Sequence, residues 1–116
     1  MEKIYNIWLS SLDIKNSTKL RLLRNYSSKE IWNLDYSSLL ENNCPDDDIS
    51  QILNSKNLEE SKNIYNYMHE HNIQIISIRD YSYPIKLNYI DDRPAFLYAR
   101  GDISILDNNA VRNCRL

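Results

Sequence analysis

Residues 72–101 read NIQIISIRDYSYPIKLNYIDDRPAFLYARG, and their pattern differs from that of the residues before them. The run from Ile73 to Ile78 is rich in β-branched residues and too short for a helix, which predicts a buried strand. Pro84 suits the first position of a short helix, because its missing N–H would be unbonded there. A second strand is predicted from Ala95 to Ala99 and is closed by Gly101. This stretch therefore predicts the opening of an α/β unit.

The first seventy residues predict short helices instead. Apolar side chains recur three and four residues apart from Ile4 to Leu12 and from Leu20 to Tyr26, which is the period of an amphipathic helix. Ser17 is the expected N-cap of the second helix, and Ser27 with Glu30 has the spacing of a capping box. Three more helices are expected at about residues 36–43, 46–53 and 58–71. The side chains expected inside are Trp8, Leu12, Leu20, Leu23, Trp32 and Ile64.

Length and composition limit the chain to one small domain, or to one domain with part of another. It has 116 residues, a net charge of −2 and a pI of about 5.6, so any contact with nucleic acid must come from a local basic patch. The expected division is a helical domain at 1–71 and the start of an α/β domain at 72–116. No apolar run has the length of a membrane span or the pattern of a secretory signal. We therefore expect a cytoplasmic protein in which Cys44 and Cys114 are reduced.

No catalytic or metal-binding motif is present in the sequence. His69 and His71 lie two residues apart on a predicted helix and project about 200° from each other, so they cannot share one metal ion. Asp46, Asp47 and Asp48 lack the alternating ligands, glycine and glutamate of a calcium loop, and they suit the start of a helix. The single glycine excludes a glycine-rich phosphate loop. We therefore expect a protein that is not an enzyme and uses no cofactor or metal.

One stretch of the sequence concentrates basic residues, namely Lys15, Lys19, Arg21 and Arg24. Lys19 falls among the apolar positions of its helix, so its aliphatic stem is expected to lie along the apolar surface. Two interpretations are open for the stretch. It is either a solvated helix face or a set of phosphate contacts that position nucleic acid without reading its sequence.

A spaced set of residues in the second part of the chain is more specific than any of these features. It comprises Asp80, Tyr83, Pro84, Leu87, Asp91, Asp92, Pro94, Leu97, Tyr98 and Gly101. This set resembles the segment that leads into the nucleotide-binding-like fold of the DNA-processing family known as DprA or Smf. The earlier residues Trp8-Leu9, Leu12 and Glu30-Ile31-Trp32 are similar to the helical N-terminal domain of that family.

The resemblance implies both a fold and a function. The fold is mainly α, a bundle of short helices of the sterile-alpha-motif or helix-hairpin-helix type, followed by the opening βαβ piece of a Rossmann-like fold. Members of the family act in natural transformation and DNA recombination, where they bind single-stranded DNA and help to load a RecA-type recombinase. The spaced residues of the second part are expected to have a structural role.

Two departures from the family pattern change what we expect of this chain. Asp13 to Ser17 stand where the family often has a turn with glycines, whose backbone approaches phosphate more closely. After Val111, where the family continues into a Val-Gly-Ser/Thr-Arg turn, this chain has Arg112 to Leu116. We therefore expect a truncated, impaired form that binds single-stranded DNA only weakly. The alternative is a helical protein–protein interaction module without DNA binding, and the sequence leaves the oligomeric state open.

Overall fold

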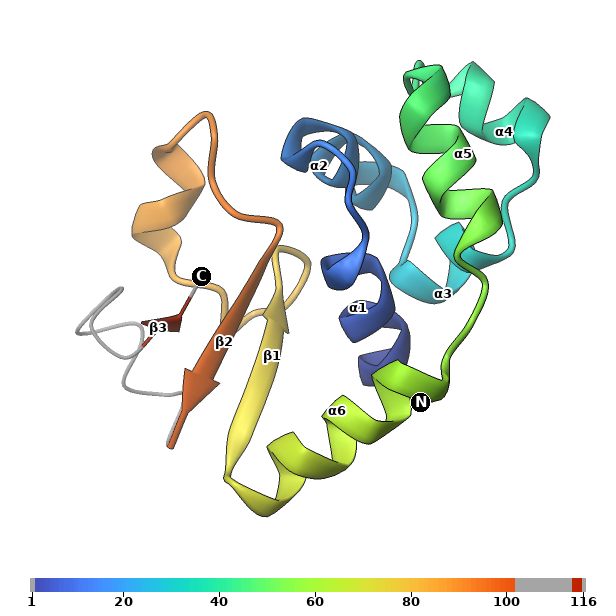
Figure 1. The fold of residues 1–116 in the computed structure, drawn as a ribbon. Helices are drawn as coiled ribbons and strands as arrows, with labels where there is room; N and C mark the ends of the chain where they lie inside the picture. The colour runs from blue at the N-terminus through green and yellow to red at the C-terminus, as the bar shows by residue number, and fades with distance from the viewer. Residues whose placement is uncertain (1, 102–113, 116) are drawn as a thin grey trace.

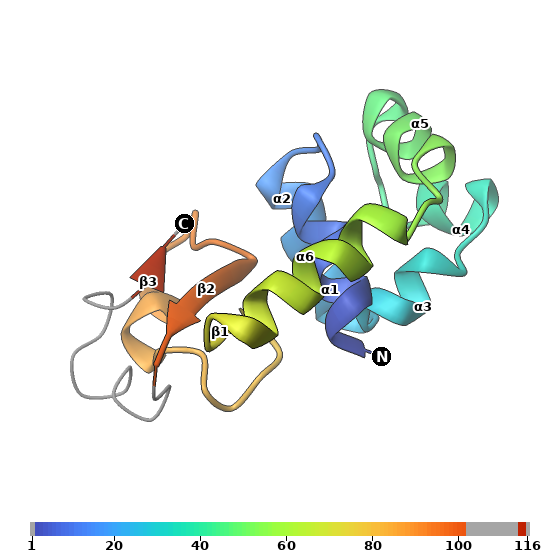
Figure 2. The same cartoon turned by 60° about the horizontal axis from the view of Figure 1, so that its bottom comes forward.

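Helices occupy the first part of the structure and strands the second. The computed structural model describes residues 2–101 and 114–115. The elements in chain order are α1 (Glu2–Ser11), α2 (Asn16–Asn25), α3 (Ser28–Trp32), α4 (Tyr36–Glu41), α5 (Asp46–Asn54), α6 (Glu59–Glu70), β1 (Ile73–Ser77), the 3₁₀ helix η1 (Ile85–Tyr89), β2 (Phe96–Arg100) and β3 (Cys114–Arg115). The α-helices lie on one side of the small sheet and η1 lies on the other (Figures 1 and 2). The prediction of a mainly helical chain with its strands after residue 72 is confirmed for the described residues.

The pairing of the strands differs from the predicted βαβ opening. β1 and β2 are antiparallel, with Ile75 opposite Tyr98, whereas the strands of a βαβ unit are parallel. The physical reason lies in the connection between them. A turn from Ser77 to Asp80 and a hydrogen bond from the Tyr83 hydroxyl to the Pro94 carbonyl (2.7 Å) hold both ends of that connection near the end of β1. The chain therefore enters β2 from the end at which it left β1.

The starts of α3 and α2 differ in whether residues nearby in the sequence set the helix end. The capping box is confirmed, because the Ser27 hydroxyl accepts from the Glu30 N–H (3.2 Å) and the Glu30 carboxylate accepts from the Ser27 N–H (2.8 Å). The prediction of Ser17 as an N-cap is wrong, since α2 begins at Asn16 and Lys15 holds the cap position without a side-chain bond. A distant carboxylate, that of Asp48 in α5, accepts from the Lys15 N–H instead (3.4 Å).

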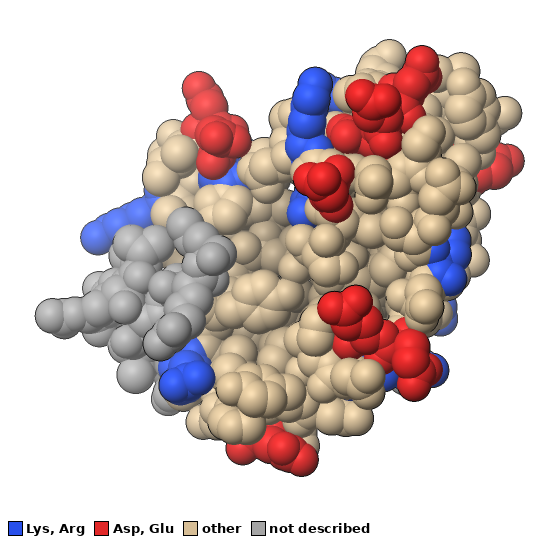
Figure 3. Space-filling view, in the orientation of Figure 1, with Lys and Arg blue, Asp and Glu red and all other residues tan. Residues whose placement is uncertain are grey.

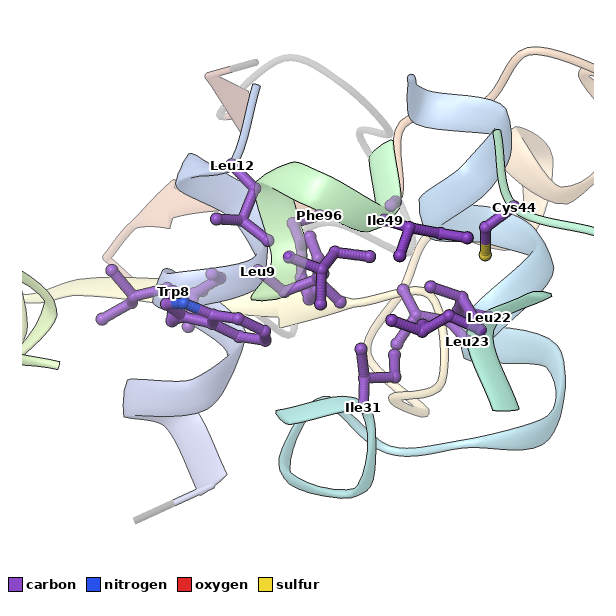
Figure 4. Close-up of a cluster of buried hydrophobic side chains, with 14 of the residues drawn as sticks. Trp8, Leu9, Leu12, Leu22, Leu23, Ile31, Cys44, Ile49 and Phe96 are labelled. Atoms are coloured by element: carbon purple, nitrogen blue, oxygen red, sulfur yellow. The ribbon is translucent and has the colours of Figure 1, made fainter. Parts of the chain in front are cut away.

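One hydrophobic core joins the helices to the sheet. Trp8, Leu12 and Leu23 are buried as predicted, whereas Leu20, Trp32 and Ile64 are only partly buried at its margin. The labelled side chains of Figure 4 meet in this core from four helices, the α1–α2 and α4–α5 connections and β2: Trp8, Leu9, Leu12, Leu22, Leu23, Ile31, Cys44, Ile49 and Phe96. Burial raises the pKa of the Cys44 thiol. A second, smaller cluster on the outer face of the sheet contains Ile76, Tyr83, Leu87, Leu97 and Ala99.

The transition from helix to strand falls at the predicted domain boundary. Asn72 follows α6 and has a φ of 54°. This is a left-handed backbone conformation, which asparagine tolerates better than most residues. The main core includes residues from both sides of this boundary, since Ile75 and Phe96 belong to it together with side chains of the helices. Within the described residues, no helix is both long and apolar enough to cross a membrane. Residues 108–113 and Leu116, on which the expected truncation depends, lie outside the described residues.

Candidate functional site

The four predicted nucleic-acid contacts do not form one open basic patch. They lie on α2 and the residue before it, but two of them bind backbone carbonyl groups. The Lys19 ammonium donates to the Ser10 carbonyl (2.9 Å), and the Arg21 guanidinium donates to the Asn43 carbonyl (2.9 Å). Burial lowers the pKa of Lys19, although the nearby carboxylates of Asp13 and Asp48 act in the opposite direction. Only Lys15 and Arg24 are exposed.

The surrounding charges also argue against a strong field on this part of the surface. Figure 3 shows basic side chains spread over the visible face, with acidic side chains between them. Asp48 is buried beneath α2, where its carboxylate accepts from the Thr18 hydroxyl (2.5 Å) and from the Lys15 N–H (3.4 Å). The local field around Lys15 is therefore partly cancelled by a carboxylate bound to the same turn of the chain.

The spaced residues of the second part converge on the outer face of the sheet and on its ends. The Asp80 carboxylate accepts from the Ser77 N–H (2.8 Å), and Pro84 precedes η1 as its N-cap residue. Leu87 and Leu97 are buried against Tyr83 in the second cluster.

The last residues of the set lie where the sheet meets other parts of the chain. Pro94 supplies the carbonyl that Tyr83 binds, and the Tyr98 hydroxyl lies 2.7 Å from the Ser10 hydroxyl of α1. Gly101 has a φ of 89°, and its N–H donates to the Asn72 carbonyl (3.0 Å). This positive φ is one that side-chain-bearing residues rarely adopt, which accounts for glycine at this position. The set therefore packs and closes the sheet.

Two residues that sequence reasoning missed attach the sheet to the helices. The Asn16 side chain donates to the Arg93 carbonyl (2.7 Å) and accepts from the Ala95 N–H (3.1 Å), so one amide bridges α2 and the start of β2. The Arg79 guanidinium donates to the Leu23 carbonyl near the end of α2 (2.8 Å). No local pattern marks either residue, because both act on backbone groups far away in the sequence.

His71 and the two tryptophans have structural contacts. The His71 ring stacks on Tyr67 with ring centroids 3.9 Å apart. The Lys56 ammonium binds the Trp32 carbonyl and lies 4.9 Å from the Trp32 ring centre and 5.6 Å from that of Trp8. Among the described residues, no group of three or more histidine, cysteine or acidic side chains is placed to hold a metal ion.

Comparison with known proteins finds no relative of this chain. No protein-family model, no curated protein and no solved structure matches it. The function of this chain is therefore inferred from its residues and their geometry.

Proposed function

We propose that this chain is a DNA-processing protein of the DprA/Smf type that acts in natural transformation in the cytoplasm, without enzymatic activity of its own. The observation that supports the proposal is the spaced set from Asp80 to Gly101, whose members lie within one short segment of the sequence and pack on or around one small sheet. The helical part, of the sterile-alpha-motif or helix-hairpin-helix type in this proposal, would then precede the Rossmann-like fold of such a protein. The family-level partners are single-stranded DNA and a RecA-type recombinase.

The geometry favours weak binding of single-stranded DNA by the described residues. Lys19 and Arg21 are engaged with carbonyl groups, which leaves Lys15 and Arg24 as the phosphate contacts of the basic stretch. Each phosphate neutralised on a single strand contributes about 0.7 to the slope of log affinity against log salt concentration. Two contacts therefore predict a contribution of about 1.4 to that slope.

The test is a salt titration of binding to a single-stranded oligonucleotide, with Lys15→Ala/Arg24→Ala against the parent chain. We expect lower affinity and a salt slope smaller by about 1 to 1.4. Lys29→Ala/Lys62→Ala is the matched control, because it removes the same charge from two exposed lysines on other helices. Equal losses in both double variants would contradict a site on α2. Nanomolar affinity that neither variant changes would place the DNA site elsewhere.

A second candidate function is a protein–protein interaction module that does not bind DNA. The observation in its favour is the set of large apolar or aromatic side chains that are exposed in the described residues: Tyr36, Leu40, Tyr67, Tyr81, Ile85, Tyr89 and Ile90. Association through such side chains tolerates salt, whereas phosphate contacts do not. Retention of a recombinase at high salt, without retention of the oligonucleotide, would favour this function over DNA binding.

A further inference from the structure

A small cavity of about 190 Å³ lies between the end of α1, the start of α2 and β2. Polar side chains reach its wall from all three elements: Ser10 of α1, Lys19 of α2 and Tyr98 of β2. Pro94 and Phe96 add apolar surface to the wall. Sites for small molecules combine an apolar wall with a few convergent polar groups in this way. The volume is below the about 300–1,000 Å³ of pockets that hold drug-sized ligands, so the ligand that fits is small.

The polar groups of the wall are connected to one another. The Lys19 ammonium donates to the Ser10 carbonyl (2.9 Å), and the hydroxyl of the same serine lies 2.7 Å from the Tyr98 hydroxyl. The bond to the Ser10 backbone therefore holds the ammonium of Lys19 beside the two hydroxyls. Three groups from three separate elements thus meet at one cavity.

These three groups carry more donor hydrogens than they use among themselves. An ammonium group has three hydrogens, and Lys19 gives one of them to the Ser10 carbonyl. Two hydroxyls have two hydrogens, and only one of these lies between Ser10 and Tyr98. The set therefore offers two N–H donors and one O–H donor to an acceptor beyond these three residues.

The cavity places these donors where water is partly excluded. Burial is the main cause that lowers the pKa of Lys19, and burial also raises the pKa of the Tyr98 hydroxyl. The carboxylates of Asp13 and Asp48 act on Lys19 in the opposite direction to burial, but no acidic side chain of the described residues is part of the cavity wall. A charge-assisted hydrogen bond is stronger in such surroundings than in water.

The number of charges and donors selects the kind of acceptor. A carboxylate has one negative charge and two oxygens, so one oxygen can accept from the ammonium and the other from the hydroxyl pair. A phosphate monoester carries a charge of about −1.5 to −2 at neutral pH and would meet only the one cation of Lys19 here. Pro94 and Phe96 also suit a short aliphatic chain better than a bare inorganic ion.

We propose that this cavity binds the carboxylate of a short aliphatic acid. One carboxylate oxygen accepts from the Lys19 ammonium and the other from the Ser10–Tyr98 hydroxyl pair, while the aliphatic chain rests on Pro94 and Phe96. The source of the carboxylate is either a free acid or an acidic side chain of a partner. The inference goes beyond the proposed function and does not depend on DNA binding.

The test uses the whole chain and follows its backbone amide signals by NMR during titration. Butyrate is the free-acid probe, N-acetylglutamate methylamide is the side-chain probe, butanamide is the neutral counterpart of butyrate, and butyl phosphate is the alternative anion. We expect both carboxylates to shift the Lys19 and Tyr98 amide signals to saturation and butanamide to leave them unchanged. Tighter binding of butyrate would identify a free acid as the source, and tighter binding of the glutamate probe a side chain.

A first variant tests the role of the cation. Lys19→Met keeps most of the aliphatic stem and removes the charge, so it should weaken butyrate binding about ten-fold or more. Lys62→Met is the matched control, because Lys62 is exposed on α6 and is not part of the cavity wall. We expect this control to bind butyrate as the parent chain does.

The hydroxyl pair requires a double variant, because either hydroxyl alone can still donate to the ligand. Ser10→Ala/Tyr98→Phe removes both hydroxyls and should weaken butyrate binding by about two- to ten-fold. The control, Ser11→Ala/Tyr89→Phe, removes the same two groups from exposed residues outside the wall. Unchanged amide signals far from the cavity will show that each variant keeps its fold.

Several outcomes would overturn the proposal. Saturable shifts with butanamide would show that charge is not recognised, and tighter binding of butyl phosphate than of either carboxylate would assign the cavity to phosphate. Equal weakening in Lys62→Met would reduce the effect to net charge, and unchanged affinity in Ser10→Ala/Tyr98→Phe would place the ligand outside this cavity. The absence of saturation with both carboxylates would exclude the site in the parent chain itself, whatever the folding of the variants.

Discussion

The helical part, residues 2–71, and the sheet part, residues 73–101, bury their side chains in different ways. Most of the main core comes from the helices, which pack on one another, and Ile75, Ala95 and Phe96 add the inner face of the sheet to it. The outer face is covered by the sheet part's own connection, through Tyr83 and Leu87. A small sheet with two faces thus obtains one cover from the helices and one from itself. The helices therefore have a core of their own. The sheet part on its own would have only its outer face covered, because the helices cover the inner face.

The largest expected effect tests whether the two parts share a core. Leu9 is fully buried in the main core (Figure 4), and Leu9→Ala should lower the free energy of unfolding by about 2–5 kcal/mol. Because Phe96 lies in the same core, we expect helices and sheet to unfold in one transition. Urea unfolding followed by tryptophan fluorescence and by the amide signals of β1 and β2 measures this. Leu40→Ala, at a 49% exposed site, should change the value by less than about 0.5 kcal/mol. Amide signals of β1 and β2 that persist after the fluorescence transition would show that the two parts unfold separately.

A smaller effect is expected from a bond that lies within the helical part alone. Asp48→Asn weakens the contacts of a buried carboxylate to the Thr18 hydroxyl and the Lys15 N–H, and should cost about 1–3 kcal/mol. The same urea titration measures the loss. The control is Asp47→Asn, since Asp47 is exposed in the same first turn of α5. If both variants lose equal stability, charge at the helix start is the cause and the bond across to α2 is not.

The corresponding bond of the sheet part should have a smaller effect. Tyr83→Phe removes the hydroxyl that donates to the Pro94 carbonyl, and we expect a loss of about 0.5–1.5 kcal/mol in the free energy of unfolding. Hydrogen exchange should increase at Phe96 and Leu97 more than at Leu22, because the bond closes the connection beside β2. Tyr89→Phe is the control at an 84% exposed tyrosine and should leave exchange unchanged. Faster exchange at Leu22 to the same extent would contradict a local role.

The smallest effect concerns the capping box at the start of α3. Hydrogen bonds from the Ser27 backbone and side chain hold the pKa of the Glu30 carboxyl below its usual value. A carboxyl group with a lower pKa in the folded chain stabilises it above the unfolded pKa, and this contribution is lost as pH falls through the folded pKa. NMR titration should give a lower midpoint for Glu30 in the folded chain than in urea. Ser27→Ala should raise the folded midpoint part of the way toward the unfolded one, because it removes the side-chain bond and keeps the backbone N–H, and an unchanged midpoint would contradict the side-chain bond as a cause.

Many of the elements could be predicted because their signals are local. The Ser27 and Glu30 side chains act on backbone groups within one turn. Pro84 also marks the short helix, although it holds the N-cap position and not the predicted first helical position. The β-branched run at Ile73 forms a strand in any partner arrangement, so its position was predictable although its pairing was not. Asn72 and Gly101 mark the ends of elements through their tolerance of positive φ.

The candidate site was much less predictable. Helical periodicity placed Lys19 and Arg21 on α2, but the carbonyl groups that bind them belong to Ser10 and Asn43, outside that helix. A cavity beside Ser61 lies between α1 and the consecutive helices α5 and α6, and none of the three carries a recognisable motif.

The sequence by itself determined the helices, the positions of β1 and β2 and the burial of Trp8, Leu12 and Leu23, because periodicity and capping act over a few residues. Only the tertiary structure decided that β2 runs antiparallel to β1, that the Asp48 carboxylate binds the Lys15 N–H at the start of α2, and that Leu20, Trp32 and Ile64 lie at the margin of the core. These outcomes depend on which surfaces of separate elements meet. Such contacts form between residues far apart in the chain, so neither periodicity nor capping records them.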